Sequence, residues 1–149
     1  MDSASAPARL RARPSWLLNQ AALPAQRLVA DGLATVGARR PHFSVLAALD
    51  EFGPASQAAL GRRCGIDRSD MVALVNDLAA ADLLRRTPDP QDRRRNVIAI
   101  TEAGREHLHT LNRLLDETQE ELLAPLSAAE REQLVRMLTA VVDHHGRAR

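Results

Sequence analysis

The most informative part of this 149-residue chain is residues 56–104, which read SQAALGRRCGIDRSDMVALVNDLAAADLLRRTPDPQDRRRNVIAITEAG. The first third of this stretch predicts two short helices joined by a tight turn. Ser56 can cap a helix that runs through Arg63, and Gly65 is the helix breaker that follows. Asp67 can then cap a second helix through the free backbone amides at its start. We therefore expect a helix-turn-helix unit here.

The second helix of this unit has one apolar face and one polar face. It runs to about Ala81, and its apolar residues follow the i, i+3, i+4, i+7 spacing of a buried stripe. These residues are Met71, Leu74, Val75 and Leu78. The opposite face looks outward and carries Ser69, Ala73 and Asn76.

A basic hairpin is predicted after the two helices. A strand begins at Leu83, residues 88–91 form a proline-containing turn, and the β-branched residues between 97 and 100 favour a returning strand. Residues 85–95 hold five arginines and two aspartates, although the formal net charge of the whole chain is only +1. All 20 basic residues are arginines, which suit bidentate contacts with phosphate and guanine. The hairpin therefore displays a local positive charge on a turn.

Together these features predict a mainly α fold with a winged helix-turn-helix domain and a two-stranded β-hairpin wing, flanked by N- and C-terminal dimerisation helices. We expect residues 1–13 to be a disordered arm and residues 14–40 to form a dimerisation helix that is bent or split at Pro24. Residues 41–101 are the expected DNA-binding region. Residues 102–149 are expected to form the C-terminal dimerisation helices.

The two C-terminal helices have clear start signals and strong apolar stripes. Thr101 can cap the first helix, and Ser127 with Glu130 forms a capping box that opens the second. The stripes carry more Leu, Met and Val than two solvent-facing helices need, so the chain ends are natural dimer surfaces. The residues expected at a dimer interface are Leu17, Leu18, Leu122, Leu126, Leu134, Met137, Leu138 and Val141.

A winged helix-turn-helix places its second helix in the major groove of DNA, while the first helix and the hairpin contact the backbone or the minor groove. Asn76 can pair bidentately with adenine, Ala73 can contact a thymine methyl group, and Asp70 can accept from a cytosine amine. Ser69 can bond a phosphate or a base, whereas Arg68 suits the DNA backbone. The residues predicted to contact DNA are Ser56, Gln57, Arg68, Ser69, Asp70, Ala73, Asn76, Asp92, Arg93, Arg94 and Arg95.

Two stretches resemble the MarR-type transcriptional regulators, and the resemblance spans nearly the whole chain. Residues 92–104, DRRRNVIAITEAG, are similar to the wing signature of that family, which is Asp-x-Arg, a strand and then Thr-x-x-Gly. Residues 56–69, SQAALGRRCGIDRS, are similar to its helix-turn-helix. In such a wing Arg94 matches the tip arginine that enters the minor groove, and Asp92 orients an arginine through opposite charges. The neighbouring arginines are then candidates for phosphate contacts.

The resemblance implies a homodimeric repressor that binds the two half-sites of a pseudo-palindromic double-stranded operator. It also implies that DNA affinity falls when a small aromatic or phenolic molecule binds between the dimer helices and the winged domain, where aromatic side chains often stack on the ligand. This chain has only three aromatic residues of the Phe, Trp and Tyr types. Trp16, His42 and Arg39 are the candidates to line such a pocket, as a stacking surface, a switchable donor and a cation.

Other function classes find little support in the sequence. No apolar run is long enough for a membrane span and no secretory signal is visible, so we expect a cytoplasmic protein without a membrane partner. The single cysteine, Cys64, excludes an internal disulfide, and its place in the turn favours core packing over redox chemistry. The sequence has no phosphate-binding loop, nucleophile elbow or paired-histidine helix motif. We therefore expect no enzyme, no metal and no cofactor.

Two alternatives remain open from the sequence. A ligand-independent or architectural DNA-binding protein would have the same winged domain but no effector response. A dimeric interaction protein that has lost DNA binding would leave the arginine-rich wing without a role. The salt dependence of DNA binding separates these classes, because each neutralised phosphate adds about 0.9 to the slope of log affinity against log salt.

Overall fold

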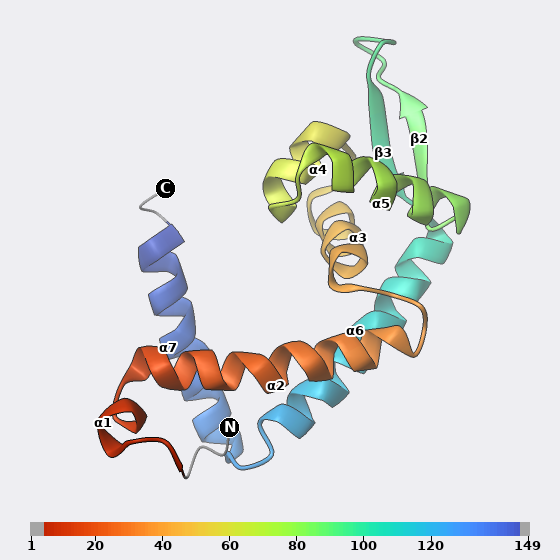
Figure 1. Cartoon of the computed structure of the whole chain (residues 1–149). Helices are drawn as coiled ribbons and strands as arrows, with labels where there is room; N and C mark the ends of the chain where they lie inside the picture. The colour runs from red at the N-terminus through yellow and green to blue at the C-terminus, as the bar shows by residue number, and fades with distance from the viewer. Residues whose placement is uncertain (1–4, 147–149) are drawn as a thin grey trace.

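The computed structural model describes residues 5–146 (Figure 1). Over that range it contains seven helices and three strands. This composition confirms the predicted mainly α fold with a hairpin wing. The elements in chain order are α1 (Ala8–Arg11), α2 (Pro14–Ala34), α3 (Arg40–Phe52), β1 (Ala55–Ser56), α4 (Gln57–Cys64), α5 (Arg68–Ala80), β2 (Leu84–Pro88), β3 (Asn96–Ile100), α6 (Glu102–Leu122) and α7 (Ala128–Gly146).

The N-terminal region differs from the prediction in two ways. Residues 5–13, expected to be disordered, include helix α1, and the side chain of Ala6 is buried; the disorder predicted for residues 1–4 lies outside the described residues. Helix α2 runs through Pro24 as one element and ends at Ala34, so the predicted split is wrong, while a bend at Pro24 stays a prediction. Both differences have a tertiary cause, because α1 packs on α2 and α2 packs on α6. Such packing provides most of the stability of a helix, and here it offsets the roughly 3 kcal/mol that an interior proline costs through its missing N–H donor and the clash of its ring with the carbonyl four residues earlier.

A three-stranded antiparallel sheet forms the base of the wing, in the order β1-β3-β2. Leu84 pairs with Ile100 at one end of the hairpin and Pro88 pairs with Asn96 at the other. The third strand, β1, pairs Ala55 with β3 and was missing from the two-stranded prediction. A strand of two residues is too short to carry the alternating pattern that predicts strands.

One hydrophobic core joins the helix-turn-helix, the sheet and the long helices. The apolar stripe predicted for α5 is buried in this core. Helices α2 and α6 reach the same core through Leu33, Leu108 and Leu111, so the winged domain is packed directly on them. The remaining large core side chains come from α3, α4 and the sheet, and are Val45, Leu46, Leu49, Leu60, Leu84, Ile98 and Ile100.

Thr101 and Gly104 fix the angle at which α6 leaves the sheet. The Thr101 hydroxyl donates to the carbonyl of Asp82 at 2.7 Å and accepts from the amide of Gly104 at 2.9 Å, as its predicted capping role requires. A Cβ atom added at Gly104 would lie 2.0 Å from the carbonyl oxygen of Leu83. The Thr-x-x-Gly pattern of the sequence is therefore needed for the close packing of α6 on the chain that enters β2.

Helix α7 crosses α2 and stands apart from the winged domain (Figure 1). The predicted capping box starts it, with the amide of Ser127 donating to the carboxylate of Glu130 at 2.8 Å and the amide of Glu130 donating back to the Ser127 hydroxyl at 3.3 Å. Arg131 closes the turn from α6 by donating to the carbonyls of Leu123 and Leu126, each at 3.1 Å. No residue of α7 is buried. Within residues 5–146, no helix has the combination of length and apolarity that a membrane crossing requires.

Candidate nucleic-acid interface

Helices α4 and α5 meet at a turn that local hydrogen bonds hold in place. The Ser56 hydroxyl accepts a backbone amide of α4 at 3.2 Å, and Gly65 adopts the left-handed conformation with φ of 65°. The Asp67 carboxylate accepts the amide of Asp70 at 2.9 Å and the hydroxyl of Ser69 at 2.8 Å. These two bonds, the amide first, lower the pKa of Asp67. Because the Ser69 hydroxyl already donates to Asp67, its oxygen is left as an acceptor.

The outward face of α5 is exposed, as the spacing predicts. Ser69, Ala73 and Asn76 all lie on it and are open to solvent. Arg68 and Asp70, on the first turn, are exposed as well. Val72 was not predicted as part of this face, yet it is 42% exposed and lies one turn before Asn76.

A side chain of the wing reaches this outward face. Arg86 on β2 donates a hydrogen bond from Nη2 to the amide oxygen Oδ1 of Asn76. Side chains alternate along a strand, so Leu84 and Arg86 share one face of β2, where Leu84 is buried in the core and Arg86 is exposed. The sequence gives no signal for this contact, because the pairing register of the sheet decides which wing residue reaches α5.

The loop between β2 and β3 is organised around Asp92. Its carboxylate accepts the backbone amide of Arg94 at 3.0 Å, and its carbonyl accepts the amide of Arg95 at 2.9 Å. Nε of Arg95 also lies 3.5 Å from the carboxylate oxygen Oδ2 of Asp92, so Arg95 is the arginine with which Asp92 pairs. Arg93 and Arg94 are exposed and form no ion pair with any residue between 5 and 146.

An open groove of about 910 Å³ lies between α4, α5 and the wing. It brings together five of the predicted DNA contacts, while Arg93 and the outward residues of α5 beyond Arg68 lie outside its lining. Arg62 and Asn96 also line the groove and were not predicted. Arg62 lies four residues after Ala58 on the same face of α4, but Ala58 was not a predicted contact, so only the structure identifies Arg62. The predicted residues in the lining are Ser56, Gln57, Arg68, Arg94 and Arg95.

The charges along this groove have one sign. Its ionisable lining residues are Arg62, Arg68, Arg94 and Arg95, and no acidic residue lines it. The carboxylate of Asp92 offsets Arg95 from outside the lining. A concave surface lined by cations attracts a polyanion such as the phosphate backbone of DNA.

The three residues predicted to line an effector pocket do not meet within one chain. Trp16 lies in the first turn of α2, about 27 Å from the end of that helix at about 1.5 Å per residue, whereas Arg39 and His42 lie at the start of α3. The amide of Arg39 donates to Nδ1 of His42 at 2.9 Å, and the Arg39 guanidinium lies 3.8 Å from the carboxylate of Asp77. The sequence did not reveal this separation, because a break in the helix at Pro24 would have allowed Trp16 to fold back toward Arg39 and His42, whereas α2 is one continuous helix.

The environment of His42 favours its neutral form. Burial lowers the pKa of His42 most, and the charge of Arg39 lowers it further. His107 on α6 acts in the same direction, whereas Asp77 opposes these effects. The ring can therefore keep Nδ1 as an acceptor for the Arg39 amide at neutral pH.

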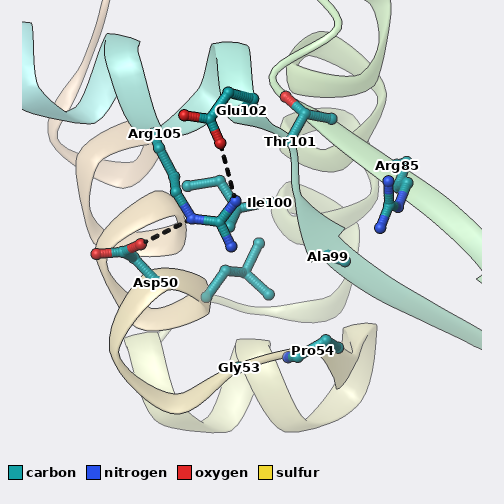
Figure 2. A pocket seen from close by; sticks show the side chains of 10 residues that line it. Asp50, Gly53, Pro54, Arg85, Ala99, Ile100, Thr101, Glu102 and Arg105 are labelled. Carbon is teal, nitrogen blue, oxygen red and sulfur yellow. Dashed lines mark ion pairs between the residues drawn. The ribbon is translucent and has the colours of Figure 1, made fainter.

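A smaller hollow of about 380 Å³ lies at the base of the wing (Figure 2). Arg105 of α6 pairs there with Asp50 of α3 at 3.3 Å and with Glu102 at 3.5 Å. Arg85 of β2 lies on the rim. Cations and carboxylates balance each other more closely here than in the arginine-lined groove, and none of the three predicted effector residues lines this hollow.

Cys64 lies at the end of α4, half-buried, with Sγ 3.6 Å from the carbonyl of Ser44. Burial raises the pKa of its thiol, which keeps the group in its less reactive protonated form. This environment supports the packing role predicted for Cys64. Among the residues that the structure describes, no group of three or more His, Cys, Asp or Glu side chains is arranged to hold a metal ion.

Known proteins are similar to this chain both in the sequence of the interface and in the overall fold. The sequence profile of the MarR family matches residues 36–95. The chain is 32% identical to the HTH-type transcriptional repressor NicR of Pseudomonas putida over 68% of its own length and 64% of NicR. Because the match covers slightly less than two thirds of NicR, it does not extend to that whole protein.

Solved structures match over more of their length. A probable transcriptional regulator from Pseudomonas aeruginosa is 32% identical, with a TM-score of 0.75, over 89% of this chain and 98% of that one. The PcaV regulator of Streptomyces coelicolor, solved with its natural ligand, is 28% identical with a TM-score of 0.73 over 93% and 97% of the two chains. The repressor CouR, solved on a 23-mer DNA duplex, is 27% identical with a TM-score of 0.80 over 91% and 96%.

These relatives are transcriptional regulators and not enzymes, in agreement with the prediction from the sequence. The chain therefore shares its fold with these solved relatives over nearly their whole length. With the profile match over the winged region, these similarities establish that the chain belongs to the MarR family of winged helix-turn-helix transcriptional regulators.

Proposed function

We propose that this protein is a homodimeric repressor that binds a specific double-stranded DNA operator in the cytoplasm and is released by a small aromatic or phenolic effector. The observation that carries the proposal is the groove between α4, α5 and the wing, whose ionisable lining residues are all arginines. Four guanidinium groups on one concave surface suit the phosphates of a duplex. The similarity to CouR, which was solved on DNA, supports the same partner here.

Each part of the interface has a distinct role in this proposal. Helix α5 enters the major groove and presents Ser69, Asp70, Ala73 and Asn76 to base edges. The start of α4, with Ser56 and Gln57, and Arg68 of α5 contact the DNA backbone. In the wing, Arg94 enters the minor groove and Asp92 holds Arg95. Arg93 and Arg95 contact phosphates.

A second copy of the chain covers the apolar surface of the terminal helices. Helix α7 exposes Met137 at 54% and Val141 at 49%, and α2 exposes Leu17 at 49% and Leu18 at 45%. Leu138 of α7 is also exposed, and α7 stands apart from the winged domain (Figure 1). Burying such a surface gains about 25 cal/mol per Å² of apolar area. Three more residues predicted at the dimer interface are half-buried near the α6–α7 turn: Leu122, Leu126 and Leu134.

Dimer geometry sets DNA affinity in this mechanism. Two α5 helices must enter successive major grooves about 34 Å apart on a pseudo-palindromic site. A ligand that favours a dimer with another spacing therefore releases DNA. About 5.5 kcal/mol of differential binding moves such an equilibrium from 99:1 to 1:99.

The effector pocket is proposed at the start of α3, between the winged domain and the long helices. Arg39 offers a cation and His42 a partly buried ring, and both suit an anionic aromatic compound. Trp16 can join them only from the partner subunit of the dimer, because α2 separates it from α3 within one chain. PcaV, solved with its natural ligand, supports ligand control in a similar protein.

The test is fluorescence-anisotropy binding of the full chain to duplex DNA from upstream of its own gene and to a scrambled duplex, across salt concentrations, with and without salicylate. Tight, salt-dependent and sequence-selective binding supports a specific regulator, and weakening by salicylate supports the effector. Equal affinity for scrambled DNA would indicate an architectural protein. The absence of any binding would refute the DNA-binding role.

A further inference from the structure

We infer that Arg86 and Asn76 form a donor-rich, positively charged unit that reads guanine in the major groove; this inference rests on the DNA-binding function proposed above. Asn76 lies on the exposed outward face of α5, and Arg86 comes from the inner face of β2. The Nη2 group of Arg86 donates to Oδ1 of Asn76. The hydrogen bond joins the recognition helix to the wing at the surface that faces DNA.

The bond fixes which end of the Asn76 amide is free. A guanidinium has five N–H donors and no acceptor, so only the amide oxygen can face Arg86. The NH₂ group of Asn76 must then point away from Arg86, and its two N–H donors are free to contact a base. Arg86, which is exposed, keeps further N–H donors beside it.

This arrangement changes the base that Asn76 prefers. A free asparagine pairs with adenine by accepting from N6 and donating to N7. The oxygen needed for the first of these bonds already accepts from Arg86 through one of its two lone pairs, and the N6 donor of adenine would face the positive guanidinium and its N–H groups. Guanine presents two acceptors, N7 and O6, on its major-groove edge, and two donors match them. The prediction of adenine for Asn76, which treated the side chain as free, is replaced by guanine in this inference.

The backbone of Arg86 is held firmly enough for it to position Asn76. Arg86 pairs with Ile98 in the hairpin, and Ile98 is buried in the core. Residue Leu84, on the same face of β2, is buried in that core too. Arg85 points to the opposite face of the strand, toward the hollow that contains Asp50 and Arg105 (Figure 2). Arg85 therefore offers a matched control with the same charge on the same strand.

The test is selection of duplexes from a randomised DNA library by the wild-type chain and by the variants Asn76→Ala, Arg86→Ala and Arg85→Ala. Loss of selectivity in Asn76→Ala identifies the base pair in each half-site that Asn76 reads. At that pair the wild-type chain should prefer guanine over adenine by about tenfold. Arg86→Ala should lose this preference and shift toward adenine, because the guanidinium that orients the amide and faces the N6 donor of adenine is removed. Arg85→Ala should lower affinity without changing the preferred base.

Three results would overturn the inference while leaving the proposed function intact. The wild-type chain could prefer adenine at the pair that depends on Asn76, Arg86→Ala could select the same sequences as the wild-type chain, or Asn76→Ala could leave every position unchanged. If the wild-type chain enriches no duplex at all, the proposed function itself fails and the inference fails with it. Circular dichroism of each variant verifies that the fold is retained.

Discussion

Replacing Arg94 with alanine should flatten the salt dependence of DNA binding. Among the described residues, the groove contains three arginines without an ion pair, Arg62, Arg68 and Arg94, whereas Arg95 is offset by Asp92. Each of these arginines is counted as neutralising one phosphate, with Arg94 doing so from the minor groove, so the six copies in a dimer at about 0.9 each contribute about −5.4 to the slope of log affinity against log salt. Removing Arg94 from both protomers should reduce this contribution to about −3.6, while Arg93, outside the groove, contributes equally to both proteins.

The difference is large enough to measure directly. Through these groove contacts, raising salt from about 50 to about 200 mM should weaken wild-type binding by about 10³-fold and Arg94→Ala binding by about 10²-fold. Fluorescence anisotropy on one operator duplex gives both slopes. Arg113→Ala, on the exposed surface of α6, removes the same charge away from the groove and should leave the slope unchanged. Equal slopes for the wild-type chain and Arg94→Ala would refute the contact between the wing and DNA.

Three further predictions concern the fold and the dimer. Gly104→Ala should destabilise the protein by about 2 kcal/mol in urea unfolding, because the new Cβ would lie 2.0 Å from a backbone carbonyl oxygen and this clash exceeds the gain in helix propensity of about 1 kcal/mol. The control is Gly146→Ala, whose added Cβ meets nothing within 4 Å, and equal stability of the two variants would contradict the argument. Asp67→Ala should lower the melting temperature at neutral pH, because a carboxyl group with a lowered pKa stabilises the folded state only while it is ionised. The difference in melting temperature from the wild-type chain should therefore vanish as the pH falls through the folded-state pKa of Asp67. A difference that persists in acid would show that the cap does not depend on this charge. Val141→Asp should yield monomers in light scattering and weaken operator binding, whereas Asp143→Ala on the same helix should leave the dimer intact. A Val141→Asp protein that remains dimeric would exclude this face of α7 from the interface.

Local patterns in the sequence were sufficient to predict most of the helix-turn-helix. The caps at Ser56, Asp67 and Thr101 depend on residues three positions apart, so they are visible without a structure. The buried stripe of α5 follows from helical spacing in the same way. In contrast, β1 has two residues and is a strand only because β3 lies beside it.

The charge of the interface was predictable, whereas its hydrogen-bonding partners were not. The arginines of residues 85–95 are evident from composition, and the wing signature identified Asp92 and Arg94. Arg62 could be identified only once the structure showed which face of α4 borders the groove. The contact between Arg86 and Asn76 spans ten positions along the chain, and no local pattern joins two residues on different elements.

By itself, the sequence determined the class of fold, the order of the helices and the charge of the wing, because caps, helical stripes and turn residues act over a few neighbouring positions. Only the tertiary structure decided that α2 continues through Pro24, that Trp16 lies far from His42 in one chain, and that Arg86 meets Asn76. These features depend on packing between distant segments and on the register of the sheet. Contacts of this kind are set by the whole fold, and not by the residues beside them in the chain.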